Sequence, residues 1–330
     1  MQQPEFDPAF SLSVHCELDL ERYERAVLSV PLLDEGVPIE TKDLLSSSDV
    51  SAIGKYSLEE HLEFLSMHGG IHPNCPLLVL GMRNSLVNLR APIIQQGRIY
   101  AVAGEKPERS LRPYYGLGNR DGRLVVDNAL GSGHGPGEWP DFFCAGVPVL
   151  WDQLGDDALF DLMLSEATDH SHLFDLPRGA HPLATDLTRV AWSRLHAVFE
   201  QCLHADQKTI SQAMRHELGS FDPPLRRCDN YFHAVIGERE DGALVCLFGH
   251  ERLEELGKIA QRRGCRRAVC VENSGSIMPT WLPKGLAGEM IPLLRAPNFR
   301  LRGRAVMVFE LPDASFSTFP SSPAEPAIDT

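Results

Sequence analysis

The sequence predicts an α+β protein with a mixed β-sheet core, flanking helices and a helical insertion. Apolar runs separated by Gly and Asp turns, which are typical of strands, fill residues 76–150 and resume over 231–311. Between them, residues 152–220 space their apolar side chains three and four apart, as helices do. We therefore expect one domain over 1–312, with the insertion at about 152–220 packed on the core, and a disordered Pro- and Ser-rich tail over 313–330.

The first elements each have a local signature. Residues 11–33 alternate apolar and polar side chains on both sides of a polar turn, which indicates two strands. A helix is expected over 57–67, because Ser57 is a good N-cap and Glu60 follows three residues later in the capping-box pattern.

The later elements are predicted from their turns. Turn residues between apolar runs predict three hairpins, with bends at Gln95-Gln96-Gly97, Arg120-Asp121-Gly122 and Glu240-Asp241-Gly242. A second amphipathic helix should cover 251–264 and end at Gly264. A last strand is expected at 303–311.

The composition favours an acidic globular protein that acts on a small molecule. The 45 Asp and Glu residues outnumber the 31 Lys and Arg residues, and a net charge of -14 repels phosphate backbones, so nucleic acid is not an expected partner. No apolar run is long enough to span a membrane, and residues 1–10 do not resemble a signal peptide. The 8 scattered cysteines contain no CxxC pair, which indicates a reduced, cytoplasmic protein.

Two groups of arginines interrupt this acidic background. Each group is either the lining of an anionic site or a solvated face beside a strand. The groups are Arg262, Arg263, Arg266 and Arg267, and Arg295, Arg300, Arg302 and Arg304.

A polar turn follows the strand expected at 268–271. Polar and small residues placed directly after a buried strand lie at a sheet edge, where ligand sites gather. The amides of such a turn can also point at an oxyanion, although a plain polar turn has the same pattern. Glu272 is the candidate catalytic carboxylate, and the candidate substrate-binding residues are Asn273, Ser274, Gly275 and Ser276.

The segment 231–282 resembles the core of the phosphodiester glycosidase domain family. That family carries an R-[TS]-A-I-G…DG hairpin, an L-T-L-x-E-L-A type helix and an N-L-D-G-G-G-S turn. The counterparts here are His233-Ala234-Val235-Ile236-Gly237, Asp241-Gly242, Leu253-Glu254-Glu255-Leu256 and Val271 to Ser276. Weaker matches follow the family's order over about 98–311. The resemblance implies a phosphodiester-glycosidase-like fold and hydrolysis of a small glycosylated or phosphorylated compound.

The sequence departs from the family at the residues that matter for chemistry. His233 stands where the motif has Arg, and Glu272 stands where it has Asp. The family's N-G-G-F-F segment has its nearest counterpart at Asn84, a further candidate substrate-binding residue. A His in place of a fixed cation can titrate, so Glu272 and His233 would form an acid–base pair. The alternative is that His233 is a core histidine satisfied by backbone groups.

The glycine-rich loop over 131–140 is a further candidate for the pocket border. His134 is a candidate substrate-binding residue in this loop, and Trp139 could offer an apolar wall to a sugar, unless Trp139 packs in the core. The histidines at 170, 172 and 181 lack the spacing of a zinc site, so neither a metal nor a cofactor is expected.

The leading functional hypothesis is an intracellular enzyme that acts on a small glycosylated or phosphorylated compound through an acid–base carboxylate. Two alternatives remain open. One is a diverged family member that catalyses a non-hydrolytic natural-product tailoring step, and the other is a small-molecule-binding protein without catalysis. The sequence leaves the identity of the substrate and the oligomeric state open.

Overall fold

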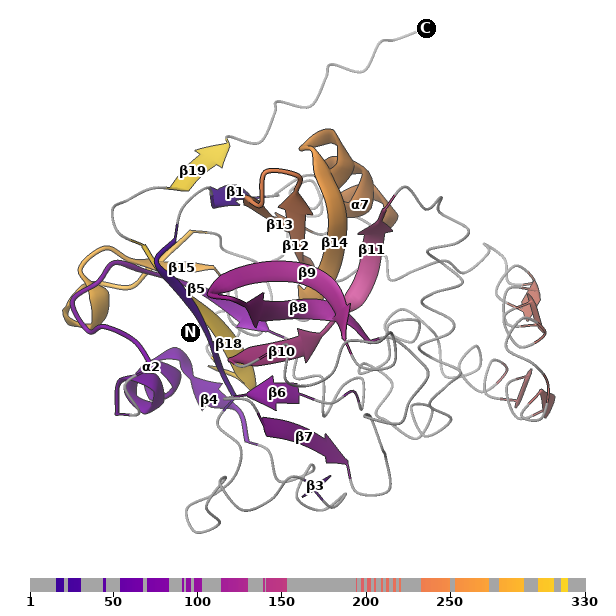
Figure 1. Cartoon of the computed structure of the whole chain (residues 1–330), viewed down its shortest axis with the longest axis horizontal. Coiled ribbons are helices and arrows are strands. Elements are labelled where there is room, and N and C mark those ends of the chain that lie inside the picture. The colour runs from indigo at the N-terminus through magenta and orange to yellow at the C-terminus, as the bar shows by residue number, and fades with distance from the viewer. Residues whose placement is uncertain are drawn as a thin grey trace, which may run out of the picture.

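β-strands predominate in the computed structural model of the chain (Figure 1). Within the described residues, the strands form two six-stranded sheets, one five-stranded sheet and one two-stranded sheet. The structure describes residues 16–20, 23–30, 44–45, 54–67, 70–82, 91, 93–95, 98–102, 114–129, 139, 141–152, 233–249, 253–272, 279–293, 302–311 and 316–319, together with single positions between 194 and 220.

Sheet 1 has the strand order β11-β14-β12-β13-β1-β19, and all its neighbours are antiparallel. Its strands are β1 (Cys16–Leu20), β11 (Val147–Trp151), β12 (His233–Arg239), β13 (Leu244–Gly249), β14 (Cys265–Glu272) and β19 (Phe316–Phe319). Strand β19 lies within the segment expected to be a disordered tail, and it pairs with β1 at the sheet edge.

Sheet 2 has the order β16-β15-β5-β18-β2 and is also antiparallel. Its strands are β2 (Arg25–Ser29), β5 (Leu77–Met82), β15 (Thr280–Leu282), β16 (Ile291–Pro292) and β18 (Ala305–Glu310). Strand β5 comes from the segment 76–150, whereas β15 and β18 come from 231–311. The two segments that the sequence assigns to one β-rich core therefore pair directly.

Sheet 3 has the order β3-β7-β6-β10-β8-β9, with a single parallel pair, β3–β7. Its strands are β3 (Leu44–Leu45), β6 (Ile93–Gln95), β7 (Arg98–Val102), β8 (Tyr114–Arg120), β9 (Arg123–Ala129) and β10 (Phe142–Ala145). The two-stranded sheet pairs β4 (Tyr56–Ser57) with β17 (Arg302–Gly303).

The expected α+β class, with a mixed sheet and flanking helices, is wrong. In the described part of the chain the α-helices are α2 (Leu58–Met67) and α7 (Leu253–Arg262), and a 3₁₀ turn, η7, covers Gly285–Ala287. Tight hairpins join successive strands such as β8–β9 and β12–β13, and antiparallel pairs of this kind need no helical crossover. The helical insertion at about 152–220 lies outside the described residues except for single positions.

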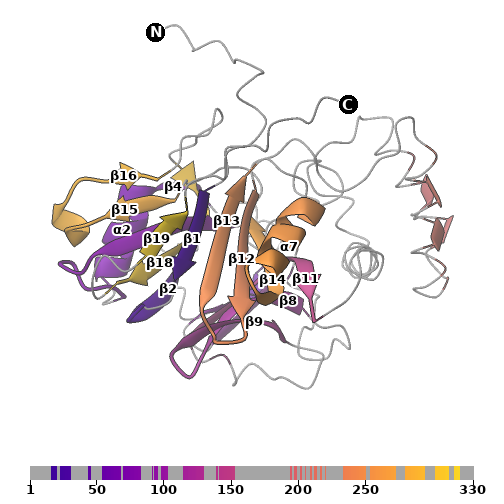
Figure 2. The ribbon, with the colours of Figure 1, turned by 90° about the horizontal axis from the view of Figure 1, so that it is seen from above.

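The two helices cover opposite outer faces of a sandwich formed by sheets 1 and 2. Leu58, Leu62 and Leu65 of α2 pack against the outer face of sheet 2. On the other side, Leu256 and Ala260 of α7 pack against the outer face of sheet 1. Figure 2 shows α2 on the left and α7 on the right, with β18 of sheet 2 and β12 and β13 of sheet 1 between them.

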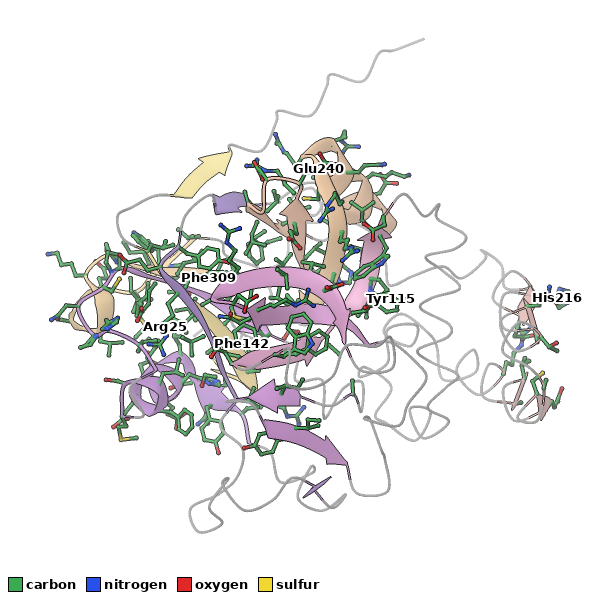
Figure 3. The ribbon with its side chains drawn as sticks, in the orientation of Figure 1. Arg25, Tyr115, Phe142, His216, Glu240 and Phe309 are labelled. Carbon is green, nitrogen blue, oxygen red and sulfur yellow. The ribbon has the colours of Figure 1, made fainter. Side chains whose placement is uncertain are left out.

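The central apolar cluster fills the space between the sheets. Side chains alternate across each strand, so β18 sends Met307 inward to this cluster and Val308 outward to α2. Phe309 of sheet 2 and Tyr115 and Phe142 of sheet 3 also belong to the central cluster (Figure 3). Sheet 3 thus closes one side of the sandwich.

Side chains from neighbouring elements accept hydrogen bonds from the backbone amides of the edge strand β9. The amide of Leu124 donates to the hydroxyl oxygen of Tyr23 at 2.6 Å, and the amide of Val126 donates to Glu238 Oε2 at 2.9 Å. Burial raises the pKa of the Glu238 carboxyl, and the bond from Val126 opposes this shift. These bonds satisfy outward amides of the edge and tie sheet 3 to sheet 1 through β12.

Gly257 marks the closest approach between α7 and β11. A Cβ at this position would lie 2.3 Å from the carbonyl oxygen of Val149, a backbone atom that cannot move independently. We expect Gly257→Ala to lower the free energy of unfolding by about 1–3 kcal/mol, although Ala favours helices. Urea unfolding measures the change, and Lys258→Ala at the exposed next position is the control. A variant at least as stable as the wild type would contradict this packing.

Candidate functional site

Glu272 lies at the end of a buried strand, as the sequence predicts. It is the last residue of β14, and only 5% of it is exposed. Its register partner in β12 is Ala234, whereas the next pair is Val235 with Cys270, so Val271 is the extra residue of a β-bulge. Bulges bend a strand and re-aim its side chains, and this one sits immediately before the candidate carboxylate.

The negative charge of Glu272 acts on the guanidinium of Arg304. Arg304 lies between β17 and β18 and is partly buried. Burial lowers the pKa of the Arg304 guanidinium, and the negative charge of Glu272 opposes this shift. Glu272 ends a strand of sheet 1 and Arg304 precedes a strand of sheet 2, so this electrostatic interaction acts between the two sheets.

Sequence reasoning named Arg304 only as one of a group of arginines. Of the same group, Arg302 is exposed and pairs with Glu60 of α2 at 3.2 Å, and Arg295 and Arg300 lie outside the described residues. The position of Arg304 directly before the last apolar strand was the available signal. Arg304 is partly buried and Arg302 is exposed, and this difference appears only in the folded chain.

His233 lies at the same end of sheet 1, in the strand next to Glu272. It begins β12 and is fully buried. Its Nδ1 lies 4.0 Å from Cys270 Sγ, and the thiol of Cys270 donates a hydrogen bond to the backbone oxygen of Glu272 at 3.2 Å. Cys270 therefore links the two predicted catalytic residues, and the acid–base pairing of their side chains stays a prediction.

The remaining candidate residues lie outside the described residues. These are Asn84, His134, Asn273, Ser274, Gly275 and Ser276. Asn84 follows Met82, the last residue of β5, by two positions, and Met82 pairs with Ala305, the neighbour of Arg304. The roles of these six residues stay predictions.

The prediction that Trp139 forms an apolar wall of the pocket is wrong. Trp139 is fully buried, and its ring centroid lies 5.1 Å from that of Phe143. The guanidinium carbon of Arg120 lies 4.4 Å from the ring centroid, so a cation covers one face of the indole. A Cβ on Gly118 would lie 2.4 Å from the ring, which shows how closely the indole packs on β8.

The described ranges contain neither a cluster of metal-ligating side chains nor a membrane-spanning helix. No group of three or more His, Cys, Asp or Glu residues there is arranged to hold a metal ion. None of the helices in those ranges is long and apolar enough to cross a membrane.

Comparison with known proteins gives a weak similarity of fold. Neither a family model nor a curated protein matches the sequence. The catalytic domain of zebrafish N-acetylglucosamine-1-phosphodiester alpha-N-acetylglucosaminidase, auto-inhibited by its pro-peptide, is a similar solved structure. The identity is 12% and the TM-score 0.41, over 87% of this chain and 73% of that chain.

Two other solved structures have lower TM-scores. A hypothetical protein from Synechocystis has 12% identity and a TM-score of 0.27, over 73% of this chain and 35% of its own length. A putative exported protein from Burkholderia pseudomallei has 12% identity and a TM-score of 0.28, over 72% of this chain and 39% of its own. This chain thus spans well under half of these two proteins. Such similarity supplies no evidence on substrate or mechanism.

Proposed function

We propose that the chain is an enzyme that acts on a small glycosylated or phosphorylated compound at the end of sheets 1 and 2. The observation that carries the proposal is the buried carboxylate of Glu272 with the partly buried guanidinium of Arg304 as its charged neighbour. Charges removed from water are costly unless they are paired or line a polar site. Two such groups brought together from different sheets are therefore typical of a functional site.

The two groups suit complementary steps. A carboxylate can donate or accept a proton at the oxygen of a breaking bond. A guanidinium binds phosphate oxygens in a bidentate manner and remains cationic at neutral pH even when burial lowers its pKa. We therefore assign proton transfer to Glu272 and binding of an anionic substrate group to Arg304. In this proposal Arg304, between β17 and β18, supplies the positive charge of the motif arginine that His233 replaces.

A ligand screen tests this proposal. Sugar phosphates, nucleotide sugars and uncharged glycosides would be added to the wild-type protein, and the melting temperature recorded. We expect a phosphorylated compound to stabilise the native state, by about 2.7 kcal/mol at 100 times its Kd. Arg304→Met should abolish this effect.

Arg302→Met is the matched control, because Arg302 lies two residues away and is exposed. It should respond to the ligand as the wild type does. Equal stabilisation of the Arg304→Met protein would contradict a role for Arg304. Stabilisation by uncharged glycosides alone would contradict an anionic substrate group.

One observation favours a second candidate function, a binding protein without catalysis. His233 is fully buried beside Cys270, as expected for a core histidine. Such a protein would bind the compound found in the screen and release it unchanged. Incubation of that compound with the protein, followed by mass spectrometry, separates the two candidates, because only an enzyme yields a product.

A further inference from the structure

A second cluster of charged side chains lies where sheets 1 and 3 meet. Asp127 of β9 accepts a hydrogen bond from Arg120 Nη2 at 2.9 Å and another from Arg267 Nη1 at 2.7 Å. Arg267 also pairs with Asp152 at 2.6 Å. Arg267 precedes Glu272 by five residues in β14, which at ~3.3 Å per residue separates this cluster from the proposed active site by roughly 16 Å.

Both arginines of the cluster stack on tryptophans. The guanidinium carbon of Arg120 lies 4.4 Å from the ring centroid of Trp139, and that of Arg267 lies 4.9 Å from the ring centroid of Trp151. An aromatic face attracts a cation and restrains the plane of the guanidinium. The arginine donors are therefore fixed before any ligand binds.

The contact between Arg120 and Trp139 contains two N–H groups without an acceptor. Within the described ranges, Arg120 Nε and Trp139 Nε1 are buried and make no hydrogen bond. Leaving such a donor unpaired costs about 1–3 kcal/mol. Two unpaired donors in one contact thus indicate that an acceptor binds there.

We propose that Arg120 and Trp139 form a binding site for one oxyanion, a carboxylate or a phosphate. The two unpaired N–H groups belong to side chains in direct contact, with the guanidinium carbon of Arg120 4.4 Å from the ring centroid of Trp139. Asp127 pairs with both Arg120 and Arg267, and Arg267 pairs with Asp152 as well. The site does not depend on Glu272 or Arg304.

The indole N–H resonance of Trp139 reports on this site directly. The chain has 4 tryptophans, and Trp139→Phe identifies the resonance by its loss. Sodium phosphate, sodium acetate and sodium chloride would be titrated at equal ionic strength. We expect phosphate or acetate to shift this resonance saturably and chloride to leave it in place. A response to phosphate alone assigns a phosphorylated ligand, and a response to acetate alone assigns a carboxylate.

Arg120→Met should weaken the anion response at least about tenfold, because it removes Nε–H and the positive charge. The matched control is Arg123→Met, the exposed register partner of Arg120 in the β8–β9 hairpin, which should bind the anion as the wild type does. If Arg120→Met fails to fold, Trp139→Phe carries the test. It keeps an aromatic ring under Arg120 but lacks N–H, so the anion should raise the melting temperature of the wild type and not of this variant.

Two results would overturn the proposal. One is a Trp139 resonance that neither phosphate nor acetate moves, which is the behaviour of a donor that a buried water already satisfies. The other is an equal shift with chloride, which is a general salt effect.

Discussion

Glu272→Gln should leave the protein folded and lower turnover by on the order of 10²-fold or more. Gln is nearly isosteric with Glu and keeps the backbone oxygen that accepts the thiol hydrogen of Cys270. The amide cannot transfer a proton or hold the charge that acts on Arg304. Initial rates with the compound that stabilises the wild type would measure the effect, and circular dichroism would verify the fold.

Glu310→Gln is the matched control for this prediction. Glu310 is also a buried carboxylate, with 1% exposed, but it lies at the far end of β18 and binds the backbone amide and Nδ1 of His72. We expect the control to lose stability and to keep its turnover per folded molecule. A Glu272→Gln protein that folds and turns over normally would place the active site elsewhere.

The stability of the protein should rise by about 3 kcal/mol between pH 4 and pH 7 because of His61. His61 is a fully buried residue of α2, and burial lowers its pKa from 6.5 to about 4. As the pH falls below 6.5, the unfolded chain binds a proton at this site, and the native protein does so only near pH 4. The stability that the neutral imidazole provides above pH 6.5 is therefore lost between pH 6.5 and 4.

The hydrogen bonds of His61 determine which ring nitrogen carries the hydrogen in the neutral imidazole. Nε2 lies 3.1 Å from the carbonyl oxygen of Gly303, which can only accept, so Nε2 carries the hydrogen. Nδ1 then accepts from the hydroxyl of Ser29, also at 3.1 Å. A second proton on the ring would remove the bond from Ser29 and place an unpaired charge in the core.

Denaturant unfolding from pH 4 to pH 7.5 tests this prediction. His61→Gln should be less stable at pH 7 by about 1–3 kcal/mol, because it weakens two buried hydrogen bonds. The difference between the wild-type and variant curves should shrink as the pH falls from 6.5 to 4. A constant difference over this range would show that His61 does not titrate as described.

Part of the candidate site could be predicted from the sequence. An apolar strand that ends in a carboxylate identified Glu272, because that pattern is contained in neighbouring residues. Arg304 could not be paired with Glu272 in this way. The two are distant in sequence, and only the packing of sheet 1 on sheet 2 brings β14 and the start of β18 together.

The burial of Trp139 also could not be predicted from the sequence. Its setting between glycines and prolines predicted a loop, and an exposed loop residue would be free to meet a ligand. In the folded chain the absence of a Cβ at Gly118 makes room for the indole against β8. Whether a side chain is in the core depends on such contacts between distant segments.

The sequence by itself determined the local elements. The capping box at Ser57 and Glu60 forms, with reciprocal bonds of 2.5 and 3.2 Å. The β8–β9 hairpin turns at Asp121 and Gly122, whose φ angles are 54° and 76°, and Gly264, with φ 82°, follows α7. These features depend on the conformational preferences of a few adjacent residues, and those residues can be read directly from the sequence.

Only the tertiary structure decided how these elements combine. Strands β1 and β2 form as the alternation of residues 11–33 predicts, yet they join different sheets, β1 beside β13 and β2 beside β18. The antiparallel architecture follows from pairings of this kind, whereas the electrostatic interaction of Glu272 with Arg304 follows from the packing of sheet 1 on sheet 2. Strand pairing and charge burial are set by contacts between segments far apart in the chain, so periodicity within a segment cannot specify them.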